Sequence, residues 1–444
     1  MSLRELNNKI ASKDARLAVI GLGYVGLPVA CEFARVGFDV TGVETKKDRV
    51  TRINRGESPI EGNEPGLAEL LGEVVETCRF RATSNYQEIR DRDVILIDVE
   101  TPVDENNIPR YEALKAAIKD LGPVLRPGSL VIIESTIAPG TMVNLVLPLL
   151  TESSGSDLNE GFYLGNCPER VMPGKLLSNL RKVSRVVGGM SQETAETMST
   201  LYRHIVQADL DATDCVTAEL VKTVENAYRD VQIAFANEVA LICEAVGGDV
   251  WKVRELVNKS PGRQMHLPGA GVGGHCIPKD PWLLAYGGRD KGVPMQLIPI
   301  ARNINDSMPR HMLELLQDRL DAIGCDLENA RLLVLGYAYL EESDDTRNSP
   351  SEILVRDLID SGADVVIHDP YVSMYDGDLF EKARGADAVL VMVNHKIYRT
   401  LELAELRSAV RTPILIDGRH VFSAEQAQKE GWVYSSIGVG GVNH

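Results

Sequence analysis

An apolar segment that runs directly into a glycine-rich turn constrains the fold of this chain more than any other feature. Residues 17–20, Leu-Ala-Val-Ile, are followed by Gly-Leu-Gly-Tyr-Val-Gly at 21–26. In this pattern the first glycine permits a tight turn, the second lets a phosphate approach the backbone, and the third lets strand and helix pack closely. We therefore predict a Rossmann-type strand–turn–helix unit that binds a dinucleotide.

Strand and helix signals alternate through the first half of the chain. Helices are predicted at 111–121 and 191–205, and strands at 16–21, 39–44, 93–99, 129–134 and 183–188. This alternation predicts a parallel sheet that is covered by helices on both faces.

A long helix is predicted at 213–246, where neither glycine nor proline occurs, and a second alternating segment begins at residue 330. Its predicted strands are 331–339, 364–368, 388–393 and 413–417, and its predicted helices are 351–361 and 401–410. We predict an α/β fold of two Rossmann-like doubly wound domains joined by a long central helix. The expected boundaries are 1–208 for the first domain, 209–308 for a central helical dimerisation region and 309–444 for the second domain.

Composition excludes several classes of protein. The net charge of -17 over 444 residues disfavours non-specific binding to nucleic acid or membranes, because both are anionic. The seven cysteines form no Cys-x-x-Cys pair, which argues against a disulfide framework or a structural zinc site and favours a reducing compartment. No apolar run is long enough to span a membrane and the polar start is not a signal peptide, so we expect a cytoplasmic protein.

A second glycine-rich segment carries one cysteine. Gly-Gly-His-Cys-Ile-Pro-Lys-Asp occupies residues 273–280, with Cys276 as its only thiol. A thiolate is the usual nucleophile of cysteine chemistry, and a nearby ammonium group such as that of Lys279 favours it. Together with a nicotinamide cofactor, such a thiol can take an alcohol past the aldehyde, because the captured aldehyde becomes a second hydride donor.

Two other interpretations of Cys276 are available. Most free cysteines are quiet buried thiols, but the preceding glycines at 271, 273 and 274 favour access to the backbone here. Metal ligation with His266 and His275 matches no familiar zinc spacing. We predict a nucleophile and no metal.

Several side chains are placed where they could serve a dinucleotide site. Glu44 follows the second predicted strand, where a carboxylate can accept from ribose hydroxyls and repel the extra phosphate of NADP. NAD is therefore favoured, although Lys46, Lys47 and Arg49 nearby weaken that preference.

Three further side chains are candidates for proton or oxyanion chemistry. Lys222 and Asn226 are four residues apart and share one face of the predicted helix, an arrangement that can hold an oxyanion but that a solvated face also explains. Glu169 follows a predicted strand end and could relay protons, while a surface ion pair with Arg170 is an equal alternative. The acidic run at 341–345 resembles a solvated loop and leads to Arg347, which could meet a phosphate.

Taken together, these motifs resemble those of the UDP-glucose/GDP-mannose dehydrogenase family, almost from end to end. The matching segments are Gly-Leu-Gly-Tyr-Val-Gly-Leu-Pro at 21–28, Glu-Thr-Pro at 100–102, Ser-Thr-Ile-Ala-Pro-Gly-Thr at 135–141, Cys-Pro-Glu-Arg-Val at 167–171, Ala-Glu-Leu-Val-Lys at 218–222, Pro-Gly-Ala-Gly-Val-Gly-Gly-His-Cys at 268–276, Asp-Thr-Arg at 345–347, His-Asp-Pro-Tyr-Val at 368–372 and Asp-Gly-Arg at 417–419. Within the family the chain most resembles the branch that acts on UDP-N-acetyl-D-mannosamine. Branches that act on UDP-glucose, UDP-N-acetylglucosamine or UDP-N-acetylgalactosamine are alternatives.

The resemblance implies a four-electron oxidation of a UDP-sugar to its uronate with two NAD, through a thiohemiacetal and a thioester on Cys276. It implies that Lys222 and Asn226 stabilise alkoxide-like oxygens, that Asp280 and Thr136 position water, and that Glu169 assists proton transfer. The NAD-binding residues that it implies are Gly21, Gly23, Tyr24, Val25, Gly26, Glu44, Arg49, Thr101, Thr136, Lys279 and Arg347. The substrate-binding residues that it implies are Glu169, Arg170, Lys222, Asn226, Arg263, Gly273 and Arg419.

The resemblance also implies a UDP-sugar site in the second Rossmann-like domain. The long helix at 213–246 favours a homodimer or higher homo-oligomer, because such a helix commonly packs against its symmetry mate. One departure concerns Leu340, since family members often carry lysine there, and it leaves the sugar open. Two other functions stay open at this point. One is a single-step dehydrogenase of the β-hydroxyacid type, and the other is a dinucleotide-binding regulator without catalysis.

Overall fold

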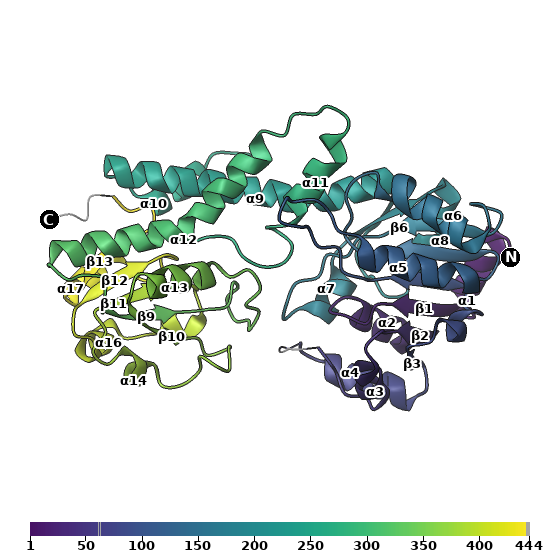
Figure 1. The fold of residues 1–444 in the computed structure, drawn as a ribbon, viewed down its shortest axis with the longest axis horizontal. Helices are drawn as coiled ribbons and strands as arrows, with labels where there is room; N and C mark the ends of the chain where they lie inside the picture. Colours follow the sequence, from purple (N-terminus) through teal and green to yellow (C-terminus); the bar gives the residue numbers. More distant parts are fainter. Residues whose placement is uncertain (61, 63, 441–444) are drawn as a thin grey trace. The chain divides into compact units, whose positions relative to one another are not determined.

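The structure is a computed structural model that describes residues 1–60, 62 and 64–440. The chain forms two compact units: unit 1 comprises Met1–Glu225 and Lys279–Pro294, and unit 2 comprises Asn226–Pro278 and Met295–His444. Helix α9, Cys215–Val246, contributes residues to both units (Figure 1). None of the helices in the described part of the chain is long and apolar enough to cross a membrane.

Unit 1 contains an eight-stranded sheet in the order β3-β2-β1-β4-β5-β6-β7-β8. Its strands are β1 Arg16–Ile20, β2 Asp39–Val43, β3 Phe80–Thr83, β4 Val94–Ile97, β5 Ser129–Ile133, β6 Phe162–Asn166, β7 Arg185–Gly189 and β8 Leu210–Asp214. Its helices are α1 Leu3–Ser12, α2 Gly26–Arg35, α3 Lys47–Asn54, α4 Leu67–Glu76, α5 Glu112–Leu121, α6 Leu147–Ser154, α7 Leu176–Lys182, α8 Gln192–Tyr202 and α11 Asp280–Arg289, with short helical turns η1 Tyr86–Ile89, η2 Gly122–Val124 and η3 Met142–Val146.

The sheet of unit 1 is buried on both faces, because alternate residues of each central strand serve different cores. Along β1, Leu17 and Val19 join the core formed with α1, α2, α4, α7 and α8. Ala18 and Ile20 join the core formed with α5, η3 and α6 on the other face. The uninterrupted apolar run that follows from this arrangement is typical of parallel sheets.

The first six strands have the order of a dinucleotide-binding sheet, whose ligand crevice lies where the strand order reverses, between β1 and β4. The sheet is parallel, as predicted, except at one place. Strand β7 runs antiparallel to β6, with Asn166 opposite Gly188, and β8 then runs parallel to β7. Apolar runs carry no information on strand direction, so the sequence pattern could not reveal this reversal.

Unit 2 contains a five-stranded parallel sheet in the order β10-β9-β11-β12-β13, which is also doubly wound. Its strands are β9 Arg331–Leu335, β10 Asp364–His368, β11 Ala388–Val391, β12 Ile414–Asp417 and β13 Val433–Ser436. Its helices, besides its part of α9, are α10 Val250–Val257, α12 Leu297–Ala322, α13 Pro350–Asp360, α14 Leu379–Ala383, α15 Lys396–Arg399, α16 Leu403–Ala409 and α17 Ala424–Lys429. The helices α9, α10, α12 and α13 cover one face and α14 to α17 the other.

The predicted fold class, two doubly wound α/β sheets with a long helix between them, is confirmed. Helix α12 is a second long helix that the sequence pattern did not reveal. It continues through Pro309, a residue that normally ends a helix because it lacks the amide donor.

Candidate active site

The glycine turn between β1 and α2 requires glycine at two of its three positions. Gly21 has a φ of +93°, and a Cβ there would stand 2.3 Å from the carbonyl oxygen of Asp98. A Cβ on Gly26 would stand 1.9 Å from the carbonyl oxygen of Gly21, because the helix begins in contact with the turn. Gly23 differs from both, since a Cβ there would meet nothing within 4 Å.

This geometry fits a dinucleotide. The open space beside Gly23 is where a pyrophosphate needs to approach the backbone, and no side chain caps the amides at the start of α2. Free helix N-terminal amides and the helix dipole favour an anion at that point. The residues present therefore fit NAD, with Gly21, Gly23 and Gly26 shaping the phosphate site and Tyr24 and Val25 leading into the helix.

Glu44 and Arg49 are linked to the same turn. Arg49 Nη2 donates to the carbonyl of Leu22 (2.8 Å), and Arg49 Nε lies 3.5 Å from a carboxylate oxygen of Glu44. The hydroxyl of Tyr24 donates to Glu64, which also accepts from the amide of Gly174 (2.8 Å). Arg49 thus links the end of β2 to the turn, and its guanidinium pairs with Glu44 instead of pointing into an open phosphate site.

Alanine substitutions should separate cofactor binding from folding at this turn. Gly23→Ala should fold as the wild type does but lose NAD affinity, because the methyl group enters space that only a ligand fills. Gly26→Ala should lower the free energy of unfolding by about 1 to 3 kcal/mol, because the methyl group meets the Gly21 carbonyl. Calorimetric NAD titration and urea unfolding measure the two effects. Equal NAD affinity in wild type and Gly23→Ala would contradict this placement.

The loops after β4 and β5 bring together four predicted site residues of unit 1. The hydroxyl of Thr101 donates to the carbonyl of Thr136 (2.6 Å), and Lys279 Nζ donates to the carbonyl of Thr101 (3.1 Å). Lys279 Nζ also lies 3.4 Å from a carboxylate oxygen of Asp280, the first residue of α11. Both side chains of this last pair are buried, so a fixed ammonium–carboxylate pair lies at the carboxyl edge of the sheet.

The segment 135–141 after β5 is held by a residue that the sequence analysis did not single out. Glu219 on α9 accepts hydrogen bonds from the amides of Gly140 (2.6 Å) and Met142 (2.7 Å). The hydroxyl of Tyr111 accepts from the amide of Ala138 (2.9 Å). Burial raises the pKa of Glu219 to about 7, although both amide bonds oppose that change. Glu219 belongs to the segment Ala-Glu-Leu-Val-Lys at 218–222, three residues before Lys222, and this segment is the sequence signal that points to it.

The raised pKa of Glu219 predicts a dependence of stability on pH. Its folded-state pKa of about 7 exceeds the ordinary 4.5, so the folded protein binds the proton more tightly. Stability from this group is therefore greatest below pH 4.5 and decreases as pH rises to about 7, by roughly 2 to 3 kcal/mol. In Glu219→Gln the free energy of unfolding should change less between pH 5 and pH 8 than in the wild type. Glu238→Gln, which removes an exposed carboxyl from the same helix, is the control; an unchanged difference in Glu219→Gln would contradict the assignment.

Glu169 is not a surface residue and does not form an ion pair with Arg170. Its side chain is buried and pairs with Arg185, the first residue of β7. Arg170 instead pairs with Glu225, with Nε donating over 3.1 Å, and its Nη1 donates to the carbonyl of Ser184 (2.7 Å). The surface alternative for Glu169 is therefore wrong, because the reversal of β7 places a buried cation beside it.

Lys222 and Asn226 lie one turn apart on α9, as their spacing predicts. The side chain of Lys222 is buried, with 8% of its surface exposed, which contradicts a fully solvated helix face. Asn226 is partly buried and is the first residue of unit 2.

The loop before Cys276 is packed within unit 2. A Cβ on Gly273 would stand 2.6 Å from Cβ of Tyr339, and a Cβ on Gly274 would stand 2.7 Å from the ring of Tyr339. The amide of Gly274 donates to the carbonyl of Arg347 (2.9 Å). These glycines therefore make room for Tyr339 as well as shaping the loop. Cys276 is exposed, so it is not a buried thiol.

The three arginines predicted to contact ligands have different surroundings in unit 2. Arg347 forms a two-point pair with Asp345, so this part of the acidic run is not merely a solvated loop. Arg419 donates from Nε to the carbonyl of Met392 (2.8 Å) and from Nη2 to that of Gly271 (3.2 Å). It thereby ties the end of β12 to the glycine loop. Arg263 is exposed and donates to the carbonyl of Pro261 (3.3 Å).

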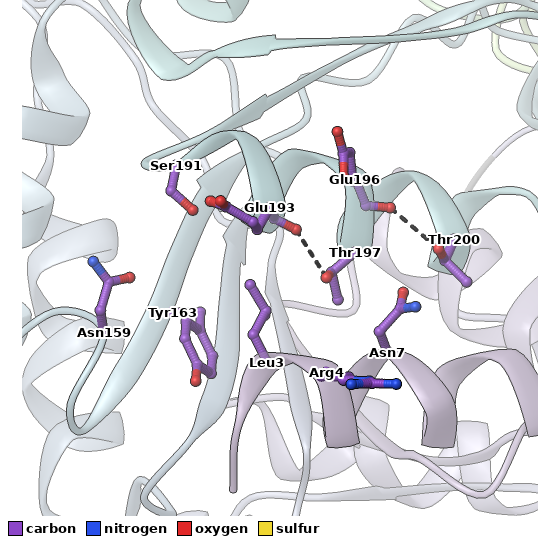
Figure 2. A pocket seen from close by; sticks show the side chains of 10 residues that line it. All are labelled: Leu3, Arg4, Asn7, Asn159, Tyr163, Ser191, Glu193, Glu196, Thr197 and Thr200. Carbon is purple, nitrogen blue, oxygen red and sulfur yellow. Dashed lines mark hydrogen bonds between the residues drawn. The ribbon is translucent and has the colours of Figure 1, made fainter.

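A groove in unit 1 lies away from all of these residues. Figure 2 shows it between α1 and α8, where the hydroxyls of Thr197 and Thr200 donate to carbonyls of their own helix over 2.9 and 3.1 Å. None of the predicted site residues lines it. In the part of the chain that the structure describes, no group of three or more His, Cys, Asp or Glu side chains is placed to hold a metal ion.

Comparison with known proteins supports the same fold and family. Residues 15–206, 216–307 and 333–424 match in turn the models of the NAD binding domain, the central domain and the UDP binding domain of the UDP-glucose/GDP-mannose dehydrogenase family. A UDP-N-acetyl-D-mannosamine dehydrogenase of Pyrococcus horikoshii is 38% identical over 427 residues, which cover 96% of this chain and 100% of the relative.

Two solved structures are similar over nearly the whole chain. One is that of a UDP-D-ManNAc dehydrogenase from Pyrococcus horikoshii, with a TM-score of 0.89 and 36% identity over 96% of this chain and 99% of the other. The other is that of an NDP-N-acetyl-D-galactosaminuronic acid dehydrogenase from Methanosarcina mazei, with a TM-score of 0.86 and 35% identity over 100% and 99%. The chain belongs to the UDP-glucose/GDP-mannose dehydrogenase family.

Proposed function

We propose that this protein is an NAD-dependent UDP-sugar 6-dehydrogenase that oxidises a UDP-N-acetylhexosamine, with UDP-N-acetyl-D-mannosamine as the first choice, to its uronate. The observation that carries the proposal is the exposed Cys276 on a glycine loop tied to unit 2, in a chain whose unit 1 has a turn that fits NAD. The names of the Pyrococcus horikoshii relative and of the matched domains support the sugar and the cofactor.

The chemistry requires four steps with a net consumption of one water. The C6 alcohol first loses a proton and a hydride to give an aldehyde, and Cys276 Sγ then bonds to C6 as a thiohemiacetal. That adduct loses a second proton and hydride to give a thioester, and water finally releases the carboxylate and regenerates the thiol. NAD held at the glycine turn of residues 21–26 would supply the hydride acceptor for both oxidations. Alcohol, water and two NAD⁺ thus give the uronate, two NADH and three protons.

Each step has a residue of this chain assigned to it. We assign to the buried ammonium of Lys222 and to Asn226 the stabilisation of negative oxygen at C6, since both lie on one face of α9. Asp280 and Thr136 hold water for the last step, and Glu169 accepts or returns protons. Arg263, Arg419, Arg170 and Gly273 serve the nucleotide sugar.

A panel of nucleotide sugars tests the proposal. The protein with NAD should form NADH fastest with UDP-N-acetyl-D-mannosamine, and more slowly with UDP-N-acetylglucosamine, UDP-N-acetylgalactosamine and UDP-glucose. Absorbance at the NADH band gives the rates, and mass spectrometry identifies the uronate. An absence of NADH with every sugar would contradict the proposal.

We also propose a homodimer formed through α9. In unit 2 this helix exposes Tyr228, Phe235, Ile242 and Val246, which fall within roughly 40° of one another at 100° per residue. Phe235→Asp should shift the sedimentation coefficient from dimer to monomer, because a charge would be buried in an apolar contact. Ile397→Asp, at an exposed apolar residue on α15, is the control. A wild type that sediments as a monomer at micromolar concentration would contradict the dimer.

A further inference from the structure

A buried charged cluster lies at the carboxyl edge of the unit 1 sheet. Asp98, Glu134 and Glu169 follow the neighbouring strands β4, β5 and β6, so the ends of three parallel strands each supply a carboxyl group. Glu134 has 1% and Glu169 7% of its surface exposed. Three carboxyl groups at a buried edge repel one another unless a cation or a proton accompanies them.

The cation is Arg185, which has 1% of its surface exposed. Its Nη1 donates to Glu134 (3.2 Å), its Nη2 pairs with Glu169, and its guanidinium carbon lies 4.9 Å from the ring centre of Tyr202. The hydroxyl of Tyr202 donates to the same Glu134 oxygen (2.7 Å). Glu134 and Tyr202 therefore fix the guanidinium, which in turn contacts Glu169.

The reversal of β7 explains how a strand-initial arginine reaches this edge. Asn166 of β6 lies opposite Gly188 of β7 in the antiparallel ladder. Glu169 lies three residues after Asn166, and Arg185 lies three residues before Gly188. If this antiparallel register is continued, Glu169 and Arg185 lie opposite each other. In a parallel β7 the first residue would lie at the other edge of the sheet.

The pKa shifts of two neighbouring carboxyl groups agree with this arrangement. Burial, followed by the charge of Glu134, raises the pKa of Asp98 well above its ordinary value. Burial also raises the pKa of Glu134, and Arg185 opposes that change. Arg185 is thus the only guanidinium that the described residues place against both Glu134 and Glu169.

We propose that Arg185 is the positioning residue of Glu169: its guanidinium, held by Glu134 and Tyr202, pairs with the Glu169 carboxylate and orients it for proton transfer. This inference rests on the proposed function, in which Glu169 handles protons. In this proposal Arg185 acts through its ion pair with Glu169. Its removal would leave two carboxylates facing each other in a buried setting, and one of them would then take up a proton.

The test compares Arg185→Met, Arg185→Lys and Arg92→Met. Arg185→Met should reduce kcat on the order of 10²-fold while the KM for the nucleotide sugar and the Kd for NAD stay within about threefold. Arg185→Lys keeps the positive charge but lacks the planar guanidinium with its two parallel donors. Its kcat should be about tenfold higher than that of Arg185→Met. Arg92, also buried and ion-paired but located before β4 at the opposite edge, is the matched control, and Arg92→Met should keep kcat.

Two readouts separate positioning from folding and from the proposed function. The acidic limb of the kcat–pH profile should move upward by about one to three pH units in Arg185→Met. Infrared difference spectra, with Glu169→Gln as the reference that identifies the Glu169 band, should show the same upward shift in the pH at which this carboxyl takes up a proton. This measurement needs no turnover. Inactivity on every sugar would therefore contradict the proposed function but not the role of Arg185. An unmoved infrared titration, or a kcat loss equal to that of Arg92→Met at equal folded fraction, would overturn the inference.

Discussion

Cys276→Ser should stop continuous uronate formation, with a loss of kcat of about 10³-fold or more, because a serine hydroxyl is a far weaker nucleophile than a thiolate. The variant should form at most a covalent ester at the introduced serine, one per subunit, that hydrolyses slowly. Intact-protein mass spectrometry after mixing with NAD and UDP-N-acetyl-D-mannosamine detects this adduct, and NADH absorbance gives the residual rate.

The control for this variant is Cys78→Ser. Cys78 is exposed, as Cys276 is, but it lies between α4 and β3 of unit 1. Its replacement should leave the rate unchanged. Full uronate turnover by Cys276→Ser would contradict a covalent role for the thiol, whatever the behaviour of the control.

Lys222→Met should lower kcat by about 10² to 10³-fold, since it removes the ammonium that we assign to the oxygen at C6. Methionine preserves much of the buried volume, so the thermal midpoint should change little. The KM for the sugar should change less than kcat, because the charge on oxygen develops mainly in the transition state. Steady-state kinetics of the variant measure both quantities.

Lys252→Met provides the matched control for Lys222. Lys252 lies on α10, is 59% exposed at its side chain and pairs with Glu255. Its loss should alter neither kcat nor KM. If Lys222→Met kept its kcat and lost only stability, the lysine would be a structural residue and the oxyanion assignment would be contradicted.

Local patterns in the sequence predicted most of the fold, because the helices, strands and turns concerned depend on residues that are neighbours in the chain. The turn at 21–26 and the glycine-free run at 213–246 identify the first dinucleotide unit and the helix α9 almost to the residue. Buried strands such as β4 and β5 are uninterrupted apolar runs, which length and flanking residues distinguish from helices.

The features that sequence patterns missed depend on partners distant in the chain. Arg185 meets Glu169 only because β7 is reversed, and Glu219 meets Gly140 across 79 positions. Helix α12 was missed because Pro309 interrupts the expected pattern. The burial of Glu169 and its pairing with Arg185 could therefore be recognised only from the strand register in the structure. Cys276, in contrast, was identified from the sequence of its loop alone.

The number of NADH formed per sugar consumed distinguishes a two-step oxidation from a single-step oxidation, because a thiol that holds the aldehyde is needed only for a second oxidation. With limiting UDP-N-acetyl-D-mannosamine and excess NAD, we expect two NADH per sugar and a uronate as the only sugar product released. One NADH per sugar, with a released aldehyde or ketone, would contradict it and would instead indicate a single-step dehydrogenase.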